Sequence, residues 1–377
     1  MANYKNISYF EGLSGLRFIA AFLVVMHHTE TIRRKNDLPN LEWFSLFRNG
    51  THAVVFFFVL SGFLITYLLL KENYRTKTVS IRNFYARRIL RIWPLYFLVV
   101  LLGTVAIPAF LQIINYDYPI PYTLKETWYY FLFFLPGLVT FYYGSSILEP
   151  LWSIGVEEVF YLLWAPVFKW LKKNLLAVIC FIIALKYTLL FIDYYYPSGS
   201  DVYRYLLHMF RFESMAIGAF GAWFIYNRAK DINQLKVYRK PVQIALYGIL
   251  IFFLMFYKNI PLQNWEKIYN HPFVSFGLNL LFIYLIMGVS MIEHNIIKLK
   301  GKPLEYLGDI SYGIYMYHLF IIFAIILFLK NMLAGMSLLW GSLLFYTLAA
   351  AGVILVAHLS KKYFENYFLR MKHKYSK

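Results

Sequence analysis

The chain has 377 residues, of which 60% are hydrophobic and only 15% are charged. Soluble domains carry about 25% charged residues, so the composition excludes an ordinary soluble protein and indicates a multi-pass membrane protein. The net charge is +18, but the basic residues lie between apolar segments and form no patch of their own, which argues against a nucleic-acid partner. The single cysteine, Cys180, excludes a disulfide framework and a thiol metal site. No metal site of any kind is predicted.

Eleven apolar segments follow one another along the chain. They are residues 13–29, 52–70, 92–111, 127–143, 152–168, 175–193, 205–226, 242–257, 272–292, 306–329 and 337–359. Most approach the roughly 20 residues that a helix needs to cross a bilayer. No small-residue cleavage site follows the first segment, so we interpret it as a retained span. The sequence predicts one all-α membrane domain over residues 1–377, with a short basic cytoplasmic tail at 361–377.

Loop charges indicate how many segments cross the membrane. Residues 71–91 are rich in Lys and Arg, which marks this loop as cytoplasmic. The later basic stretches join it on that side only if 127–143 does not cross; they are 169–173, 228–240, 298–302 and 361–377. We therefore predict about ten transmembrane helices, with both termini in the cytoplasm and 127–143 re-entrant or interfacial. One group on the first outer loop runs against the rule: Arg33, Arg34, Lys35 and Arg48.

The first apolar segment carries an arginine and ends in two histidines. Arg17 and His28 are eleven residues apart, close to three helical turns, so they share one helix face about 16 Å apart along the axis. An arginine inside a membrane helix costs at least about 2.5 kcal/mol, which makes it a functional candidate. The alternative is a structural arginine and an interfacial histidine. His27 points about 100° away from His28, so it is the weaker candidate.

Two adjacent carboxylates stand in the apolar segment 152–168. Ser153 and Glu157 are four residues apart and share a helix face, whereas Glu158 points elsewhere. The predicted topology places Glu157 at the depth of His28. A carboxylate beside a histidine can orient the ring and raise its basicity. A structural ion pair is the alternative interpretation.

Three further groups combine polar residues with helical spacing. Arg88 and Arg91 could hold phosphate through their forked donors, although a plain positive-inside anchor would have the same pattern. Two other pairs could contact a substrate or could be inert buried partners; they are His208 with Arg211, and Tyr315 with His318.

The motifs together resemble the acyltransferase-3 family of bacterial membrane O-acyltransferases. The motifs that carry the resemblance, in chain order, are GLSGLRFIAAFLVVMHH at 12–28, FFFVLSGFLI at 56–65, Arg88-x-x-Arg91, LWSIGVEEVFYLLW at 151–164 and ISYGIYMYHLF at 310–320. Each motif is weak alone, but five in register over nearly the whole chain make a specific match. The sequence lacks the SGNH-type domain that some members append, so a stand-alone form is expected.

This resemblance implies transfer of an acyl group, usually acetyl, from cytoplasmic acyl-CoA to a hydroxyl of an extracytoplasmic or lipid-linked carbohydrate in the bacterial plasma membrane. Acetyl-CoA would be a co-substrate, with no permanently bound cofactor. His28, Glu157 and Arg17 are then the predicted catalytic residues, and Arg88 and Arg91, with Arg17, the predicted CoA-binding residues. The expected substrate-binding residues are Trp152, Ser153, Glu158, His208, Arg211, Tyr315 and His318.

Two questions stay open from the sequence. His28 could act as a general base on the acceptor hydroxyl or as a nucleophile that forms a transient acyl-imidazole. The same intramembrane charges could also serve a transporter of a sugar-containing or anionic substrate, although the paired broken helices of many transporters are not found. A non-catalytic scaffold would not explain why Arg17, His28 and Glu157 lie in apolar helices.

Overall fold

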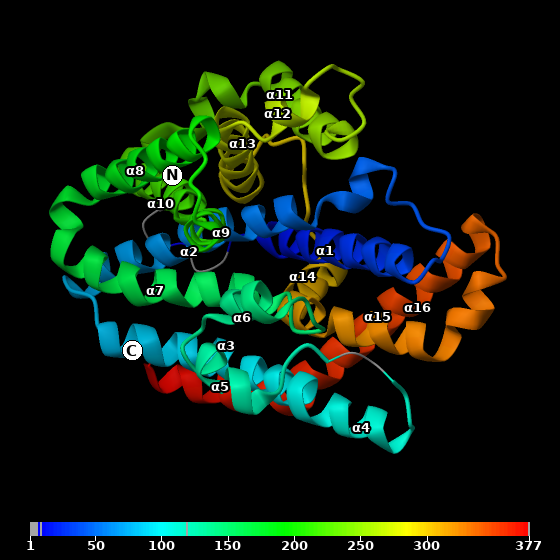
Figure 1. Ribbon diagram of the computed structural model, residues 1–377. Coiled ribbons are helices and arrows are strands. Elements are labelled where there is room, and N and C mark those ends of the chain that lie inside the picture. The colour runs from blue at the N-terminus through cyan, green and yellow to red at the C-terminus, as the bar shows by residue number, and fades with distance from the viewer. Residues whose placement is uncertain (1–6, 8–9, 118–119, 376–377) are drawn as a thin grey trace. The chain divides into compact units, whose positions relative to one another are not determined.

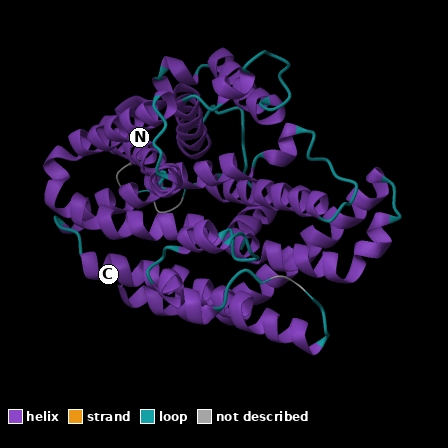
Figure 2. Ribbon diagram, viewed as in Figure 1, coloured by secondary structure: helices purple, strands orange, loops and turns teal. Residues whose placement is uncertain are grey.

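The computed structural model describes residues 7, 10–117 and 120–375, and this part of the chain contains helices and loops but no strand (Figure 2). The chain divides into two compact units. The first comprises residues 1–34, 40–79 and 166–309, and the second comprises residues 35–39, 80–165 and 310–377. Both units are therefore assembled from segments that lie far apart in the sequence (Figure 1).

Among the described residues, nine α-helices lie in the first unit. They are α1 (Leu13–Lys35), α2 (Gly50–Thr76), α8 (Leu175–Tyr195), α9 (Asp201–Met209), α10 (Phe212–Arg228), α11 (Lys240–Phe256), α12 (Trp265–Tyr269), α13 (Pro272–Met291) and α14 (Lys302–Asp309). The closest packing joins α2 to α10. A Cβ on Gly62 would lie 1.9 Å from the carbonyl oxygen of Met215, and one on Gly218 would lie 1.9 Å from that of Val59. These two glycines let the helix backbones touch, which is a common way to pack helices in membranes.

The second unit is built around α3 (Ile81–Leu101). Its other helices are α4 (Ile107–Ile113), α5 (Leu124–Leu132), α6 (Pro136–Tyr143), α7 (Leu151–Leu171, which enters the first unit at Pro166), α15 (Ser311–Ala334), α16 (Leu338–Ser360) and α17 (Asn366–Met371). Two π-helical turns interrupt this set, at Leu102–Ala106 and Lys361–Glu365. α15 packs on α16, and the C-terminal α17 with the 3₁₀ turn Lys372–Tyr375 packs along α3 (Figure 1).

Within the described residues, six helical stretches are long and apolar enough to cross a membrane, and α11 is a shorter apolar helix. The protein is thus a multi-pass membrane protein with an all-helical fold, as the composition predicted. The count of ten spans and the cytoplasmic position of both termini stay predictions. α1 is not among the six, because Arg17, His27, His28 and Glu30 lie within its first 18 residues and lower the mean hydropathy of this helix.

Three predicted segments are not single helices. Segment 127–143 forms α5 and α6, of nine and eight residues, so each is too short to cross a bilayer alone. Segment 205–226 is broken between α9 and α10 at Phe210 and Arg211, and segment 306–329 is broken between α14 and α15 at Ile310. Treating the last two as uninterrupted helices was wrong. The residues at the breaks, Phe210, Arg211 and Ile310, include no proline or glycine that would have marked them.

The break between α5 and α6 is held from two sides. Phe134 has a positive φ of 57°, which is unusual for an aromatic residue. Its ring stacks on Tyr96 at 4.7 Å and contacts Trp93 at 5.1 Å between centroids. Its carbonyl oxygen faces α7 at Gly155, where an added Cβ would lie 2.4 Å away. The close approach therefore requires glycine at residue 155.

Replacing Gly155 with alanine is expected to destabilise the protein by about 1–3 kcal/mol, because the new methyl group must push the Phe134 backbone away from α7. Thermal unfolding of the purified protein in detergent measures this effect. Gly277→Ala is the matched control, since a Cβ there meets nothing within 4 Å. Equal melting temperatures for the two variants would contradict the assigned packing.

The first predicted outer loop holds fewer free positive charges than its sequence suggests. Arg33 is buried and donates from Nη1 to Oε1 of Glu30 at 2.8 Å, and Glu30 is itself fully buried. The neighbouring Arg34 forms an ion pair with Glu42. Two of the four basic residues that run against the positive-inside rule are thus engaged in structural ion pairs.

Candidate functional site

Arg17 and His28 lie on one continuous helix, α1, as the sequence predicted. Both side chains are half-buried, and the helix is unbroken between them. Their separation along the axis is therefore about 16 Å, or three turns. Near the Arg17 end, a Cβ on Gly308 of α14 would lie 2.3 Å from the carbonyl oxygen of Ser14. This end of α1 therefore packs closely against α14.

The ring of His28 has a defined hydrogen-bonding role. Its Nδ1 lies 3.1 Å from the carbonyl oxygen of Val24, one turn earlier on α1. A carbonyl can only accept, so we assign the proton of the neutral ring to Nδ1. Nε2 then keeps its lone pair, which is the form of histidine that can accept a proton or attack a carbonyl.

A third histidine, which sequence reasoning missed, lies beside this pair. The rings of His27 and His28 are 5.2 Å apart between centroids. A Cβ on Gly50 would lie 2.4 Å from Cδ2 of His27, so the first turn of α2 rests directly on that ring. His52, in the same turn, has its Nδ1 3.0 Å from Oδ1 of Asn49. The signal was a histidine two residues after a glycine that starts a buried helix.

The two carboxylates of α7 have different partners in the second unit. Tyr161 donates its hydroxyl proton to Oε2 of Glu157 at 2.9 Å. Trp93 of α3 donates from Nε1 to Oε2 of Glu158 at 2.9 Å, whereas Oε1 of Glu158 is buried without a hydrogen bond to any described residue. Glu158, which the sequence placed on a different helix face from Glu157 and expected to bind substrate, is thus the carboxylate that faces α3.

Arg88 lies five residues before Trp93 on α3. Its guanidinium carbon is 5.9 Å from the ring centroid of Phe84 and 5.8 Å from that of Tyr161, within the range of cation–π attraction. Nε of Arg88 is buried and makes no hydrogen bond within the described residues. Glu158 is near enough to interact with this cation electrostatically. Arg88 is therefore held between aromatic rings, and its buried Nε has no hydrogen-bond partner among the described residues.

The C-terminal segment brings further cations to α3. Arg91 is exposed, three residues after Arg88. Arg87 donates from Nη1 to the carbonyl oxygen of Tyr375 at 2.7 Å, which ties the end of the chain to this helix. Burial, and then the charges of Arg91, Arg88 and Arg87, lower the pKa of Lys372 from 10.5 to about 8. From the sequence, Lys372 was only part of a basic tail.

The remaining predicted residues of the second unit form a buried polar row. Oγ of Ser153 and the hydroxyl of Tyr315 are 2.7 Å apart, and they lie 3.2 and 3.0 Å from the carbonyl oxygen of Pro150. One hydroxyl therefore donates to the other, and the second donates to the carbonyl. His318 is buried, with Nδ1 2.6 Å from the carbonyl oxygen of Tyr315. Trp152 is half-buried at the start of α7. These contacts give Ser153 and Tyr315 a structural task in joining α7 to α15.

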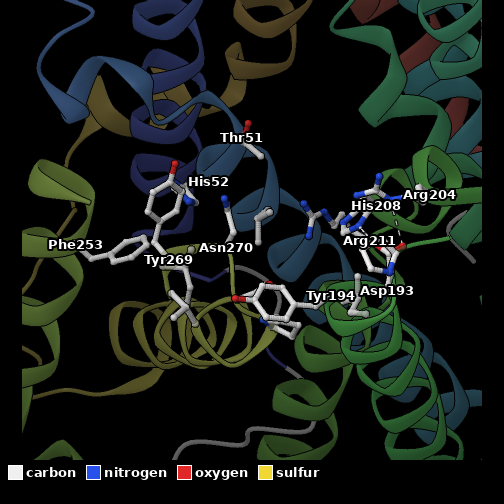
Figure 3. A pocket seen from close by; sticks show the side chains of 17 residues that line it. Thr51, His52, Asp193, Tyr194, Arg204, His208, Arg211, Phe253, Tyr269 and Asn270 are labelled. Carbon is white, nitrogen blue, oxygen red and sulfur yellow. Dashed lines mark hydrogen bonds and ion pairs between the residues drawn. The ribbon is translucent and has the colours of Figure 1, made fainter. Parts of the chain in front are cut away.

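His208 and Arg211 line a cavity of about 370 Å³ in the first unit (Figure 3). Nε2 of His208 is 2.9 Å from Oδ2 of Asp193 on α8, a partner that the sequence did not suggest. His208 lies in the last turn of α9, and Arg211 lies in the break before α10. Their predicted spacing on one helix was therefore wrong, although both line the same cavity.

The predicted residues thus fall into two sets. The first unit holds the predicted residues Arg17, His28, His208 and Arg211, and the second holds Arg88, Arg91, Trp152, Ser153, Glu157, Glu158, Tyr315 and His318. A contact between His28 and Glu157 therefore stays a prediction. In the described residues, no three His, Cys, Asp or Glu side chains are grouped so as to hold a metal ion.

A family comparison covers almost all of this structure. The profile of the acyltransferase-3 domain, described as an acyltransferase domain, matches residues 10–360. The chain belongs to the acyltransferase-3 family. The matched range of this acyltransferase-3 chain includes α1 with its Arg17–His28 face and α3 with its arginines. It also includes α7 and α15. The resemblance found from five short motifs is therefore confirmed.

Curated relatives of this acyltransferase-3 chain include O-acetyltransferases. It is 28% identical over 326 residues to the O-acetyltransferase OatA of Staphylococcus aureus strain NCTC 8325, covering 82% of this chain and 50% of the relative. It is 28% identical over 330 residues to the peptidoglycan O-acetyltransferase OatA of Listeria monocytogenes, covering 82% of this chain and 49% of the relative. The chain spans about half the length of these relatives. No solved structure matches it significantly.

Proposed function

We propose that the protein is a membrane O-acetyltransferase that moves an acetyl group from acetyl-CoA to a carbohydrate hydroxyl. Membership of the acyltransferase-3 family and the names of the curated relatives support the reaction class. The structural observation that carries the proposal is the hydrogen bond from Nδ1 of His28 to Val24, because it leaves Nε2 as the basic atom. The donor, and transfer from the cytoplasmic side of the plasma membrane to the outer side, are part of the same proposal.

The donor would be held by the cations of α3. The phosphates of CoA are best bound by forked or clustered positive groups. Arg88 offers a fork that stands between two aromatic rings, and Arg91 and Lys372 add charge nearby. Arg17, on the His28 face of α1, would stabilise negative charge that develops on the thioester oxygen.

His28 can complete the transfer by either of two routes. As a general base, Nε2 takes the proton of the acceptor hydroxyl while that oxygen attacks the thioester carbonyl; the C–S bond breaks, and the proton passes to the CoA thiolate. As a nucleophile, Nε2 attacks the thioester carbonyl first, the C–S bond breaks and CoA leaves as the thiolate. The acceptor oxygen then attacks the acetyl carbon, the C–N bond to the imidazole breaks, and the hydroxyl proton passes to the CoA thiolate. Glu157 stays a predicted catalytic residue in both routes.

The proposal is tested on cells with and without the protein. Mass spectrometry of their surface carbohydrates should show loss of one acetyl group per modified unit when the protein is missing. Purified protein should also release CoA from acetyl-CoA faster when the acceptor is added. Unchanged acetylation with accumulation of a sugar-containing intermediate on one side of the membrane would instead favour a transporter.

Binding of CoA is expected to weaken above pH 8 because of Lys372. A bound phosphate group stabilises charged Lys372 and so raises its pKa above the value of about 8 in the free protein. Binding then takes up a proton at pH values between the two pKa values. The affinity is expected to fall by up to about tenfold per pH unit there, the limit for one proton, and to be flat below pH 8. Isothermal titration calorimetry from pH 7 to 10 measures this slope.

Lys372→Gln should bind CoA more weakly at pH 7 and lose the pH dependence that belongs to the protein. Titration of CoA itself is common to all variants and cancels in the comparison. Lys374→Gln is the matched control, since Lys374 is exposed two residues later on the same turn. An identical slope in Lys372→Gln and the unaltered protein would remove Lys372 from the donor site.

A further inference from the structure

The cavity in the first unit has a lining typical of saccharide sites. Tyr269 and Phe253 lie on one side of it, and Tyr194 forms another part of its wall (Figure 3). Planar polar groups stand among these rings, including Asn270 and Asp193. Aromatic faces cover the C–H faces of a sugar ring, while planar amides and carboxylates pair with its hydroxyls. A volume of about 370 Å³ is suited to one or two sugar units.

One carboxylate in the lining already has two partners. Oδ2 of Asp193 lies 2.9 Å from Nε2 of His208, and Oδ1 lies 3.3 Å from Nε of Arg204. Asp193 is buried, whereas both partners are about half exposed toward the cavity side. Asp193 therefore balances Arg204 and fixes two donors at the cavity wall.

A second arginine of the lining is poorly balanced. The carboxylate nearest to Arg211 among the described residues is that of Glu213, at 3.8 Å. Glu213 is buried and lies at the same distance, 3.8 Å, from the buried Lys186, and neither of its oxygens accepts a hydrogen bond from a described residue. One carboxylate thus serves two cations, so the region has one positive charge in excess. Arginine forks bind carboxylate and phosphate groups most strongly.

The cavity reaches the histidines of α1 through α2. His52 lines the cavity, and it is near enough to His27 to interact with it electrostatically. Gly50, in the same turn, rests on the ring of His27, which lies 5.2 Å from that of His28. A ligand in the cavity is therefore separated from the histidine pair by a single helical turn.

We infer that this cavity binds a saccharide that carries a carboxylate or phosphate group, with Arg211 as the residue that selects the charge. The inference rests on the proposed function only where it identifies this saccharide as the acyl acceptor. The tyrosines hold the sugar ring, the Asp193 cluster orients its hydroxyls, and Arg211 receives the anionic group.

The test compares two small probes that differ by one charged group. Methyl glucuronide carries a carboxylate where methyl glucoside carries a hydroxymethyl group. The unaltered full-length protein should bind the glucuronide about tenfold more tightly, as expected for one charge-assisted hydrogen bond. Saturation-transfer NMR titrations in detergent micelles measure both affinities. Arg211→Gln should bring the two affinities within about twofold of each other, the ratio left when that bond is lost.

Matched variants separate charge selection from folding. Lys240→Gln removes an exposed cation of α11 outside the cavity and should keep the preference for glucuronide. Tyr269→Ala should weaken both sugars alike, whereas Tyr269→Phe should keep them. Equal binding of the two sugars by the unaltered protein, a preference that survives in Arg211→Gln, or displacement of glucuronide by an equal concentration of inorganic phosphate would overturn the inference.

Acetyl transfer is measured in the same preparations by CoA release. Charge-selective sugar binding without transfer would count against the proposed function and leave the cavity assignment intact. Transfer without charge-selective binding would count against the cavity assignment alone. The two conclusions therefore fail independently.

Discussion

Replacing His28 with alanine is expected to lower acetyl transfer by about 10²–10⁴-fold, the usual contribution of a positioned general acid–base group. The reason is the bond from Nδ1 to Val24, which holds the ring with Nε2 as its basic atom. Loss of a nucleophile would cost at least as much. Transfer is measured as acetyl ester formed on the carbohydrate, together with CoA release from acetyl-CoA.

His27→Ala is the control for this substitution, because it removes the neighbouring imidazole from the same helix turn. His27 packs against Gly50, so its loss should lower the melting temperature. The rate of acetyl transfer by the folded variant should stay close to that of the unaltered protein. A trapped acetyl-imidazole in acid-quenched protein would decide for the nucleophilic route. Near-normal transfer by folded His28→Ala would exclude both routes.

Much of the helical framework could be predicted from hydropathy. The predicted segments 52–70, 175–193 and 272–292 correspond closely to α2, α8 and α13, because long apolar runs bounded by polar residues have few other solutions in a membrane. The shared face of Arg17 and His28 also followed from helical periodicity alone. Both depend on local properties of one helix, which a sequence displays directly.

Breaks and partners across helices could not be predicted in the same way. Phe134 adopts a positive φ because aromatic rings from α3 hold it, and those rings are about 40 residues earlier in the chain. Glu158 rather than Glu157 faces α3, since helix rotation is set by packing and not by the sequence of α7. Lys372 reaches the arginines of α3 only because the chain end folds back along that helix.

Arg88 is the residue of the second unit whose replacement should affect CoA binding most. Arg88→Lys keeps the charge but loses the planar fork and its stacking between Phe84 and Tyr161. Two charge-assisted hydrogen bonds to phosphate contribute about 3 kcal/mol or more, so affinity for CoA is expected to fall about 100-fold. Calorimetric titration with CoA gives the change. Arg91→Lys should have a smaller effect, because Arg91 is exposed and its fork is not held by aromatic rings.

A direct effect on CoA can be separated from loss of stability through Glu158. Removing Arg88 alone leaves the buried Oε1 of Glu158 without its neighbouring cation, which should destabilise the second unit. The double variant Arg88→Leu with Glu158→Leu removes both charges and should regain melting temperature relative to Arg88→Leu, but it should still fail to bind CoA. Arg82→Lys, an exposed position in the first turn of α3, is the control that should bind CoA normally. If the double variant regained CoA binding together with stability, Arg88 would serve the fold and the phosphates would have to be held by other cations.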